Sequence, residues 1–217
     1  MQIPCTEKEL FVFKKIAHAA AARGVDAYLI GGFVRDKILG RQTKDADIVC
    51  VGDGIALAHE VASRFQPTPT VAYFKTFGTA QLKLDDWEIE FVGARKESYK
   101  YHSRNPEVEP GTLTDDQDRR DFTINALAIS LNEKDYGTLL DPFNGIADLE
   151  RKILKTPMDP VRTFSDDPLR MMRAIRFAAQ LGFTIEEKTW QAIKDNVERI
   201  RIITQERITD EMNKMML

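Results

Sequence analysis

A pair of glycines between an apolar run and an amphipathic segment is the feature that most constrains this chain. The run 27–30 has the length of a strand and ends at Gly31-Gly32, and apolar residues then recur at helical spacing as far as Gly40. A glycine turn between a strand and a helix directs backbone N–H groups and the positive end of the helix dipole at an anion, which can approach closely because glycine has no side chain. The pattern therefore predicts a phosphate-binding turn.

Two aspartates open the next apolar run. Asp45 and Asp47 lead into the run 48–51, and residues two apart on a strand share one face. Paired carboxylates supply the hard oxygen ligands that Mg²⁺ prefers. Glu88 and Glu90 likewise share a face of a later predicted strand, and one of them could supply the third carboxylate that a pair of metal ions needs.

The composition is that of an ordinary globular protein. Its 217 residues, 43% of them hydrophobic and 30% charged, suffice for one full domain and part of another. The formal net charge of −3 argues against a protein that wraps nucleic acid by charge alone, so any RNA contact has to come from a local patch or from a part outside this sequence. The sequence has neither a signal-peptide pattern nor an apolar run of membrane-spanning length, and its two cysteines lack metal-ligand spacing. We expect a cytoplasmic protein that has no membrane partner, structural zinc or disulfide framework.

The spacing of apolar residues predicts a fold of the α/β (α+β) type, in which a mixed sheet with covering helices precedes an all-helical segment. A capping box at Thr6 and Glu9 begins the first helix, which ends near Gly24. Further helices are predicted over residues 55–65, 168–181, 186–197 and 204–217, and further strands over 70–74, 79–84, 87–92 and 138–141. A change of composition after Pro157 sets the boundary between a first domain, 1–157, and a helical domain, 158–217.

Two helix faces and one long connection complete the predicted fold. The core-facing residues expected on the first helix are Leu10, Phe11, Phe13, Ile16 and Ala17. Those expected on the helix 168–181 are Leu169, Met172, Ile175, Phe177 and Ala179. The polar segment 93–118 has no periodicity, so we expect a connection that is partly mobile and lies near the site, where Lys100 and Arg104 could reach phosphates.

A second group of polar residues surrounds the apolar segment near residue 125. The segment reads Arg119-Arg120-Asp121-Phe122-Thr123-Ile124-Asn125-Ala126. The guanidinium groups of Arg119 and Arg120, at its start, could each bind phosphate oxygens in a bidentate manner. Asp121 could instead cap a following helix. Asp167 and Arg170 are three apart on a predicted helix, a spacing that usually gives only a weak surface ion pair. Beside a nucleotide, however, this pair could accept from an exocyclic amino group and donate to a ring nitrogen or carbonyl, which would select adenine and cytosine.

These motifs, in this order, resemble the nucleotidyltransferase superfamily, in particular the class II tRNA nucleotidyltransferase and bacterial poly(A) polymerase family. The matching segments are Gly31-Gly32-Phe33-Val34-Arg35-Asp36, Asp45-Ala46-Asp47, the Arg119 to Ala126 segment, Asp141-Pro142 with Gly145, Asp148 and Leu149, and Asp166-Asp167 with Arg170. Asn144 stands where many members have glycine, which weakens any argument from mobility of that loop. The resemblance implies a mixed nucleotidyltransferase-fold sheet followed by a helical neck. Members of the family continue through further helical domains, so we expect this chain to be a fragment.

The resemblance also assigns roles to individual residues. It implies that two Mg²⁺ ions are held by the catalytic carboxylates Asp45, Asp47 and Glu90, the last of which is chosen because it lies five residues before Arg95. It implies phosphate binding by Gly31, Gly32 and Arg35. It implies that the ribose and triphosphate of the incoming nucleotide are oriented by Arg120, Asp121 and Asn125. Asp167 and Arg170 would read the base, and Arg173 is a further nucleotide-binding residue.

The reaction that the resemblance implies is attack of an RNA 3′-hydroxyl on the α-phosphate of ATP or CTP, with release of pyrophosphate. We favour addition of CCA, or of part of CCA, to the 3′ end of tRNA. A bacterial poly(A) polymerase shares these motifs and is an alternative. A non-catalytic nucleotide- or RNA-binding module is another, against which the intact Asp45 and Asp47 argue. An antibiotic-type small-molecule nucleotidyltransferase would have no reason to keep the segment 119–128, and the oligomeric state is left open.

Overall fold

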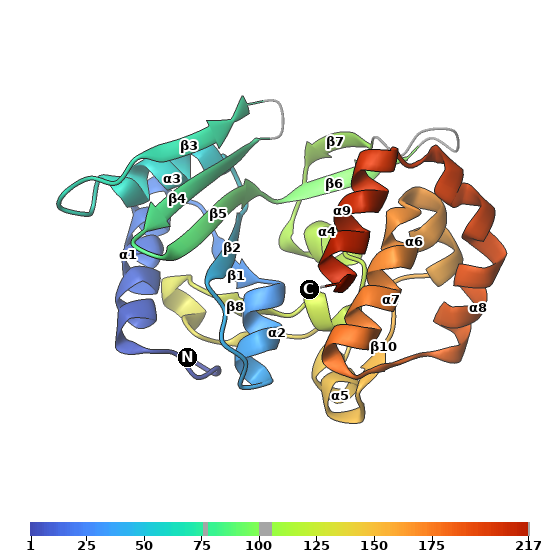
Figure 1. Ribbon diagram of the computed structural model, residues 1–217. Coiled ribbons are helices and arrows are strands. Elements are labelled where there is room, and N and C mark those ends of the chain that lie inside the picture. Colours follow the sequence, from blue (N-terminus) through green and yellow to red (C-terminus); the bar gives the residue numbers. More distant parts are fainter. Residues whose placement is uncertain (76–77, 100–105, 217) are drawn as a thin grey trace. The chain divides into compact units, whose positions relative to one another are not determined.

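The computed structural model describes residues 1–75, 78–99 and 106–216 (Figure 1). Lys100 and Arg104 therefore lie outside the described residues. The chain divides into two compact units. The first comprises Met1–Lys96, Pro110–Asp116 and Leu127–Pro142, and the second comprises Glu97–Glu109, Gln117–Ala126 and Phe143–Leu217. The domain boundary near Pro157 stays a prediction.

The first unit is built on a seven-stranded sheet with the strand order β3-β4-β5-β2-β1-β8-β9. Its strands are β1 (Ala27–Ile30), β2 (Asp45–Cys50), β3 (Val71–Phe74), β4 (Thr79–Leu84), β5 (Trp87–Gly93), β8 (Ala128–Ser130) and β9 (Leu139–Leu140). β2 and β5 are parallel, whereas the pairs β3–β4, β4–β5, β1–β2, β1–β8 and β8–β9 are antiparallel. The predicted mixed sheet is confirmed, although β8 has no counterpart among the predicted strands.

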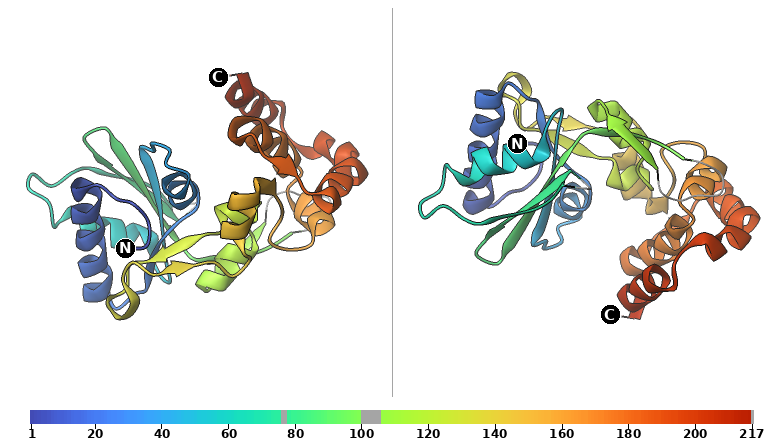
Figure 2. Two further views of the ribbon diagram at one scale, coloured as in Figure 1. Left: turned by 90° about the horizontal axis from the view of Figure 1, so that it is seen from below. Right: turned by 90° about the horizontal axis from the view of Figure 1, so that it is seen from above.

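Two helices of this unit, α1 (Glu7–Arg23) and α3 (Gly54–Ala62), pack together beside the sheet (Figures 1 and 2). α1 begins at the predicted capping box, in which Thr6 Oγ1 accepts from the Glu9 N–H and the Glu9 carboxylate accepts from the Thr6 N–H. It ends at Gly24, whose φ of 65° is the left-handed conformation that glycine adopts readily. α2 (Gly32–Ile38) directly follows β1, so the strand, turn and helix predicted around the glycine pair are confirmed.

The buried side of α1 differs from the prediction at Phe11, whose side chain is 56% exposed, and at Leu10, which is only half-buried. The buried stripe runs through Phe13, Ile16 and Ala20, at helical spacings of three and four. Phe11 lies beside this stripe, and its ring packs edge-on against Phe65 with 6.3 Å between the centroids. The predicted end of the next helix is also wrong, because α3 ends at Ala62, three residues before Phe65.

The second unit is mainly helical. Its helices are α5 (Gly145–Arg151), α6 (Pro160–Asp166), α7 (Leu169–Leu181), α8 (Glu187–Asn196), the 3₁₀-helix η4 (Val197–Ile202) and α9 (Gln205–Met216). α7 packs beside α9, and α6 packs beside α8 (Figures 1 and 2). The strands β10 (Ile153–Leu154) and β11 (Thr184–Ile185) pair in parallel, so the prediction that everything after Pro157 is helical is wrong at β11. Two residues are too few to give a periodic signal.

The buried side of α7 also differs from the prediction. Met171, Ala174 and Phe177 are buried there, whereas Ile175 is 41% exposed. The other residues expected in the core but not buried are Met172 and Ala179. Arg176 shares the buried side because its Nε lies 2.7 Å from a Glu211 carboxylate oxygen on α9. A pattern that counts only apolar residues misses a helix face completed by a buried ion pair.

The segment 93–118, expected to be an irregular connection, contains regular structure. β6 (Arg95–Ser98) and β7 (Glu107–Pro110) form a two-stranded sheet, and α4 (Leu113–Asp118) follows. The side chains of β6 and β7 are largely exposed, so these strands lack the apolar alternation by which a strand is recognised. Short 3₁₀ turns cover Thr123–Asn125 and Glu133–Asp135. Across the described part of the chain, no helix has the length and apolar character needed to cross a membrane.

Candidate active site

Four acidic residues of the first unit lie on one face of the sheet. Asp47 of β2 is the Cα partner of Glu90 on β5 and of Ile30 on β1, and Asp45 is the partner of Glu88. Because paired residues of neighbouring strands point to the same side, the four carboxylates share a face. The opposite face is fully buried under the helices and carries Ala46, Ile48, Ile89 and Phe91.

Asp47 and Glu90 influence each other electrostatically. Partial burial of the Glu90 carboxyl raises its pKa above the ordinary value, and the charge of Asp47 raises it further, while Arg95 acts in the opposite sense. Two carboxylates held beside each other are stabilised by a divalent cation, which prefers oxygen ligands. The donor set of Asp45, Asp47 and Glu90 therefore fits Mg²⁺ in chemistry. Within the described ranges, however, no three His, Cys, Asp or Glu side chains already converge as a metal site.

The glycine turn lies beside these carboxylates. Gly31 follows Ile30, the partner of Asp47, and adopts a φ of 81° at the start of α2. Its own N–H donates to the Leu127 carbonyl over 3.1 Å, so this amide does not point at a ligand. The amides that follow it begin the helix and have no partner within the helix. Gly32 lies beside Arg35, because a Cβ added at Gly32 would lie 3.6 Å from Arg35 Nη2.

Arg35 is held in place by its neighbour in the sequence. Its Nε and Nη2 donate to the two carboxylate oxygens of Asp36 over 2.9 and 3.0 Å, and the residue is only 8% exposed. Such a bidentate pair fixes the plane of the guanidinium group. Arg35 is therefore a rigid positive group next to Gly32.

Asp121 organises the predicted nucleotide-binding residues of the second unit. Its Oδ1 accepts from the Phe122 N–H and from Asn125 Nδ2, both over 2.9 Å, and its Oδ2 lies 2.6 Å from Arg173 Nη2 and 2.7 Å from Arg173 Nε. Burial alone would raise the pKa of Asp121, but Arg173 and the amide of Asn125 outweigh it and hold the pKa at about 2. Asp121 caps no α-helix, since only the 3₁₀ turn Thr123–Asn125 follows.

Arg120 and Arg170 of this unit bind the backbone of the segment 119–125. Arg120 Nη1 donates to the Asn125 carbonyl over 3.4 Å, and Arg170 Nη2 donates to the Arg119 carbonyl over 2.7 Å. Asp167 has an extended backbone conformation and lies between α6 and α7. Its Oδ1 accepts from the Leu169 N–H over 3.2 Å. The prediction that Asp167 and Arg170 lie on one helix is therefore wrong, because Pro168 separates the two helices.

Two buried acids that the sequence interpretation did not use support this network. Asp148 of α5 accepts from Thr123 Oγ1 over 2.7 Å and so fixes the 3₁₀ turn. Glu211 of α9 binds Arg176 at 2.7 Å and has Arg173 Nη1 at 3.9 Å. Asp148 belonged to a recognised motif, but its partner lies 25 residues away. Glu211 stands in no motif, so a single sequence carries no signal for it.

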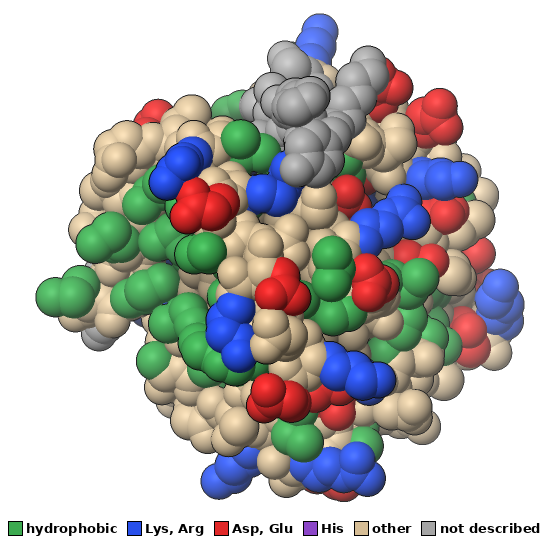
Figure 3. Space-filling model, turned by 90° about the vertical axis from the view of Figure 1, so that its right-hand side faces the viewer, with side chains coloured by type: hydrophobic (Ala, Val, Ile, Leu, Met, Phe, Trp, Pro, Cys, Tyr) green, Lys and Arg blue, Asp and Glu red, His purple; other side chains and the backbone are tan. Residues whose placement is uncertain are grey.

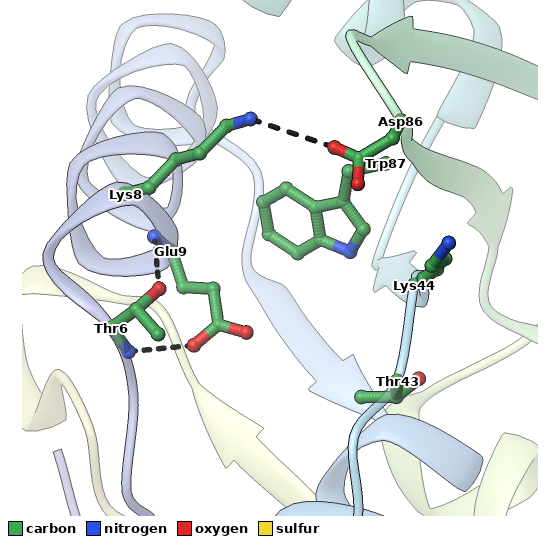
Figure 4. Close-up of a pocket in the computed structure, with 7 residues that line it drawn as sticks. All are labelled: Thr6, Lys8, Glu9, Thr43, Lys44, Asp86 and Trp87. Carbon is green, nitrogen blue, oxygen red and sulfur yellow. Dashed lines mark hydrogen bonds and ion pairs between the residues drawn. The ribbon is translucent and has the colours of Figure 1, made fainter.

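A pocket and the distribution of surface charge are two further features of the molecule. A pocket of about 140 Å³ lies between the start of α1 and the residues before β2 and β5, near Glu9, Lys44 and Trp87 (Figure 4). Trp87 contacts the ring of Phe13 of α1, so it lies on the face of β5 opposite Glu90. The pocket is therefore separate from the acidic row, which is formed by Asp45, Asp47, Glu88 and Glu90. On the face of the molecule in Figure 3, basic and acidic side chains are interspersed without a broad basic patch.

Two family models and several known proteins match this chain. The family model described as Poly A polymerase head domain matches residues 27–155, and the model described as Probable RNA and SrmB- binding site of polymerase A matches residues 182–217. The A-adding tRNA nucleotidyltransferase of Aquifex aeolicus is 46% identical over 171 residues, which are 79% of this chain and 20% of that protein. The CCA-adding enzyme of Lactobacillus helveticus is 41% identical over 194 residues, 88% of this chain and 46% of that protein.

A solved structure described as tRNA nucleotidyltransferase complexed with a primer tRNA and an incoming ATP analog superposes with a TM-score of 0.79 at 38% identity, over 91% of this chain and 55% of that one. The chain spans less than half the length of the two curated relatives above. The head-domain model nevertheless covers more than half of this chain and includes the glycine turn, the acidic row and the Asp121 segment. The chain therefore belongs to the Poly A polymerase head domain family.

Proposed function

We propose that this chain carries the catalytic part of a template-independent RNA nucleotidyltransferase, which adds C or A residues, or both, from CTP and ATP to the 3′ end of tRNA. The observation that carries the proposal is the pairing of Asp47 with Glu90 beside the turn at Gly31. The similar A-adding and CCA-adding proteins support tRNA as the substrate. The expected cytoplasmic location stays a prediction.

The carboxylates of the first unit would hold the metal ions of the reaction. We assign Asp45, Asp47 and Glu90 as ligands of two Mg²⁺ ions. When bound, such ions lower the pKa of an attacking hydroxyl and neutralise charge on a departing pyrophosphate. Burial and then the charge of Asp47 raise the pKa of Glu90, so a cation beside both carboxylates would favour their ionised forms, which supports this assignment.

The glycine turn would bind the phosphates. Gly31 supplies the positive φ that turns the chain from β1 into α2, and Gly32 leaves room beside the guanidinium of Arg35. The Arg35 guanidinium is fixed by Asp36 before any ligand binds. A charge held in position costs little reorganisation when a phosphate arrives, which favours binding.

The second unit would position the nucleotide. Asp121 fixes Asn125 and Arg173 by direct hydrogen bonds, so these groups are preorganised for the ribose and the triphosphate, together with Arg120. Asp167 and Arg170 would read the base. A carboxylate facing the amino groups of adenine or cytosine gains a hydrogen bond, whereas a carbonyl of guanine or uracil would face it with a second acceptor.

A poly(A) polymerase is the second candidate, because the matching family model takes its description from that activity. The two candidates differ in when addition stops: a CCA-adding or A-adding protein stops after a fixed number of nucleotides, and a poly(A) polymerase continues. A non-catalytic binding module is less well supported. It would have no use for the Asp47 and Glu90 pair, which is electrostatically unfavourable without a cation.

The test is extension of tRNA transcripts that end before CCA, before CA and before A, with Mg²⁺ and each nucleotide alone or CTP with ATP. The proposal predicts addition that stops when CCA is complete and that uses neither GTP nor UTP. Asp86→Asn serves as a control, because Asp86 lies in the exposed turn before β5 with its side chain 74% exposed. Long homopolymeric A tails would identify a poly(A) polymerase, and no addition to any transcript would contradict the proposal.

A further inference from the structure

The acidic face of the sheet continues beyond the candidate metal ligands. Glu90 is the Cα partner of Gln81 on β4, and Gln81 is the partner of Ala72 on β3. A single row of residues therefore crosses the sheet from Asp47 to Ala72, and all of its side chains point to the same side. Three interstrand spacings make this row about 14 Å long.

The outer part of this face is exposed. Gln81 and Ala72 are exposed. One row away, Val92 is paired with Thr79, which is paired with Phe74. Phe74 is 55% exposed, although the burial of a phenylalanine side chain is favourable by about 1.5–3 kcal/mol.

The other aromatic residue of β3, Tyr73, is also exposed, at 46%, but its ring has a packing partner. Tyr73 precedes Phe74 on β3, and its register partner Ala80 is buried beneath α3. Its ring packs against His59 of α3 with 5.8 Å between the centroids. The two neighbouring aromatic residues of β3 therefore lie on opposite faces, and Tyr73 is the one that packs against α3.

Lys83 supplies a cation at the other end of this face from Phe74. Lys83 of β4 is paired in register with Glu88, and its Nζ lies 3.9 Å from the Glu88 carboxylate, with side chains 68% and 46% exposed. An ion pair this long and exposed contributes little stability, so Lys83 can exchange Glu88 for another anion. Aromatic stacking combined with a cation is the combination by which proteins hold single-stranded nucleic acid.

We propose that the face formed by β5, β4 and β3 binds the unpaired nucleotides at the 3′ end of the RNA, with Phe74 as the stacking platform for a base and Lys83 as the contact for a phosphate. The inference rests on the proposed function, because it places the primer strand on the surface that leads to Glu90 and Asp47. Phe74 and Lys83 are positioning residues and take no part in the chemistry.

The test measures binding without catalysis, using a fluorescent RNA hairpin with an unpaired 3′ end and no nucleotide triphosphate. Phe74→Leu is expected to weaken binding roughly tenfold, because base–aromatic stacking is lost while an apolar side chain remains. Tyr73→Leu is the matched control on the opposite face of the same strand and is expected to bind as the wild type does. Circular dichroism and thermal unfolding establish that both variants are folded.

An abasic substitution separates stacking from a structural effect. Abasic sites are introduced at each unpaired position of the RNA in turn. At the position whose base stacks on Phe74, the wild type and Phe74→Leu are expected to bind the abasic RNA equally. At every other position, the difference between the two proteins should remain. In extension assays, Phe74→Leu is expected to raise KM for RNA about tenfold and to leave KM for ATP unchanged. A structural defect would change both constants.

The salt dependence of binding tests the cation. Lys83→Gln is expected to reduce the slope of log affinity against log salt concentration by about 0.7, the amount for one phosphate contact on a single strand. Lys134→Gln is a closely matched control, since Lys134 Nζ also lies 3.9 Å from its partner, Asp26, with side chains 69% and 47% exposed. It should leave the slope unchanged.

The inference is overturned if Phe74→Leu binds as tightly as the wild type, if the loss is equal on a blunt duplex without unpaired nucleotides, or if the wild type does not bind the RNA. Normal nucleotide addition with unchanged binding of Phe74→Leu would reject this inference alone. No nucleotide addition by a wild type that binds RNA through Phe74 would reject the catalytic proposal alone.

Discussion

Asp47 and Glu90 are register partners on two parallel strands, so their carboxylates stand side by side on one face of the sheet. Burial, and then the charge of Asp47, raise the pKa of Glu90 in the folded chain. A carboxyl whose pKa is higher in the folded than in the unfolded state contributes stability below its unfolded pKa, and this stability is lost as the pH rises through the folded pKa. In the metal-free protein, stability is therefore lost as the pH rises through the folded pKa of Glu90.

Glu90→Gln is expected to raise the free energy of unfolding at pH 7 in the presence of EDTA, because the substitution removes a partly buried charge and its repulsion by Asp47. The gain should disappear as the pH falls below about 4, near the ordinary pKa of a glutamate. Urea unfolding at several pH values measures both effects. Glu88→Gln is the control on the same strand and face, and it should bring no such gain because Lys83 lies near Glu88. A loss of stability in Glu90→Gln at pH 7 would show that repulsion by Asp47 is not significant.

Mg²⁺ should reverse the order of stability. The wild-type carboxylates gain a cation, whereas Glu90→Gln has lost a ligand, so Mg²⁺ is expected to raise the Tm of the wild type more than that of the variant. Thermal unfolding with increasing Mg²⁺ measures this difference. Equal stabilisation of the two proteins would place the binding of Mg²⁺ elsewhere.

Asp121→Asn is expected to destabilise the protein by about 2 kcal/mol at pH 7. Breaking a fully buried ion pair costs about 3–5 kcal/mol, but the Arg173 side chain is 33% exposed and keeps Glu211 at 3.9 Å. The folded pKa of Asp121 is about 2, so its stabilisation is present above the unfolded pKa of about 3.9 and is lost as the pH falls through about 2.

The measurement is urea unfolding of Asp121→Asn between pH 7 and pH 3, in which the difference from the wild type should begin to narrow below about pH 4. Asp85→Asn breaks an exposed pair with Lys8, in which the aspartate side chain is 81% exposed, and should have no measurable effect. An Asp121→Asn protein as stable as the wild type would mean that Arg173 does not depend on this carboxylate.

Glu211→Gln is expected to loosen the packing of α9 on α7, because Arg176 and Arg173 lose a carboxylate whose side chain is only 4% exposed. Hydrogen exchange of the amides in these two helices should become faster, and that of β1, β2 and β5 should not change. Glu198→Gln is the control, since that side chain is 73% exposed in its pair with Arg201. Unchanged exchange in α9 would show that the ion pair does not hold the helix.

Asp167→Asn is expected to reduce discrimination against GTP and UTP. An asparagine oxygen can still accept from the Leu169 N–H, so the link between α6 and α7 is preserved, while the amide adds a donor that can face a carbonyl of the base. The values of kcat/KM for the four nucleotides measure this choice. Asp166→Asn, a change at the neighbouring carboxylate, is the comparison. Unaltered preference for ATP and CTP in Asp167→Asn would reject the base-reading role.

The sequence predicts those parts of the fold that are determined by nearby residues. The capping box at Thr6, the glycine turn and the strands that contain Asp47 and Glu90 follow from local patterns, and the structure confirms these elements. The parallel pairing of β2 with β5 could not be read from spacing, because about 40 residues separate the two strands. The pairing nevertheless brings the two predicted carboxylates together.

The parts that the sequence does not predict depend on partners far along the chain. The buried side of α7 includes Arg176 because Glu211 lies 35 residues away to neutralise it. Asp121 resembles a helix cap in the sequence, whereas in the structure it holds Arg173, 52 residues away. A single sequence shows which residues are chemically suited to a site, but it does not show which of them form ion pairs.

The most direct test of the account is nucleotide addition by Asp47→Asn. Incorporation of labelled CMP and AMP onto tRNA that ends before CCA is measured at increasing Mg²⁺, for the wild type and for variants shown by circular dichroism to be folded. The account predicts Mg²⁺-dependent incorporation by the wild type and a loss of about a hundredfold to a thousandfold in Asp47→Asn, the scale on which electrostatic stabilisation of the transition state acts. Incorporation by Asp47→Asn at the wild-type rate would contradict it.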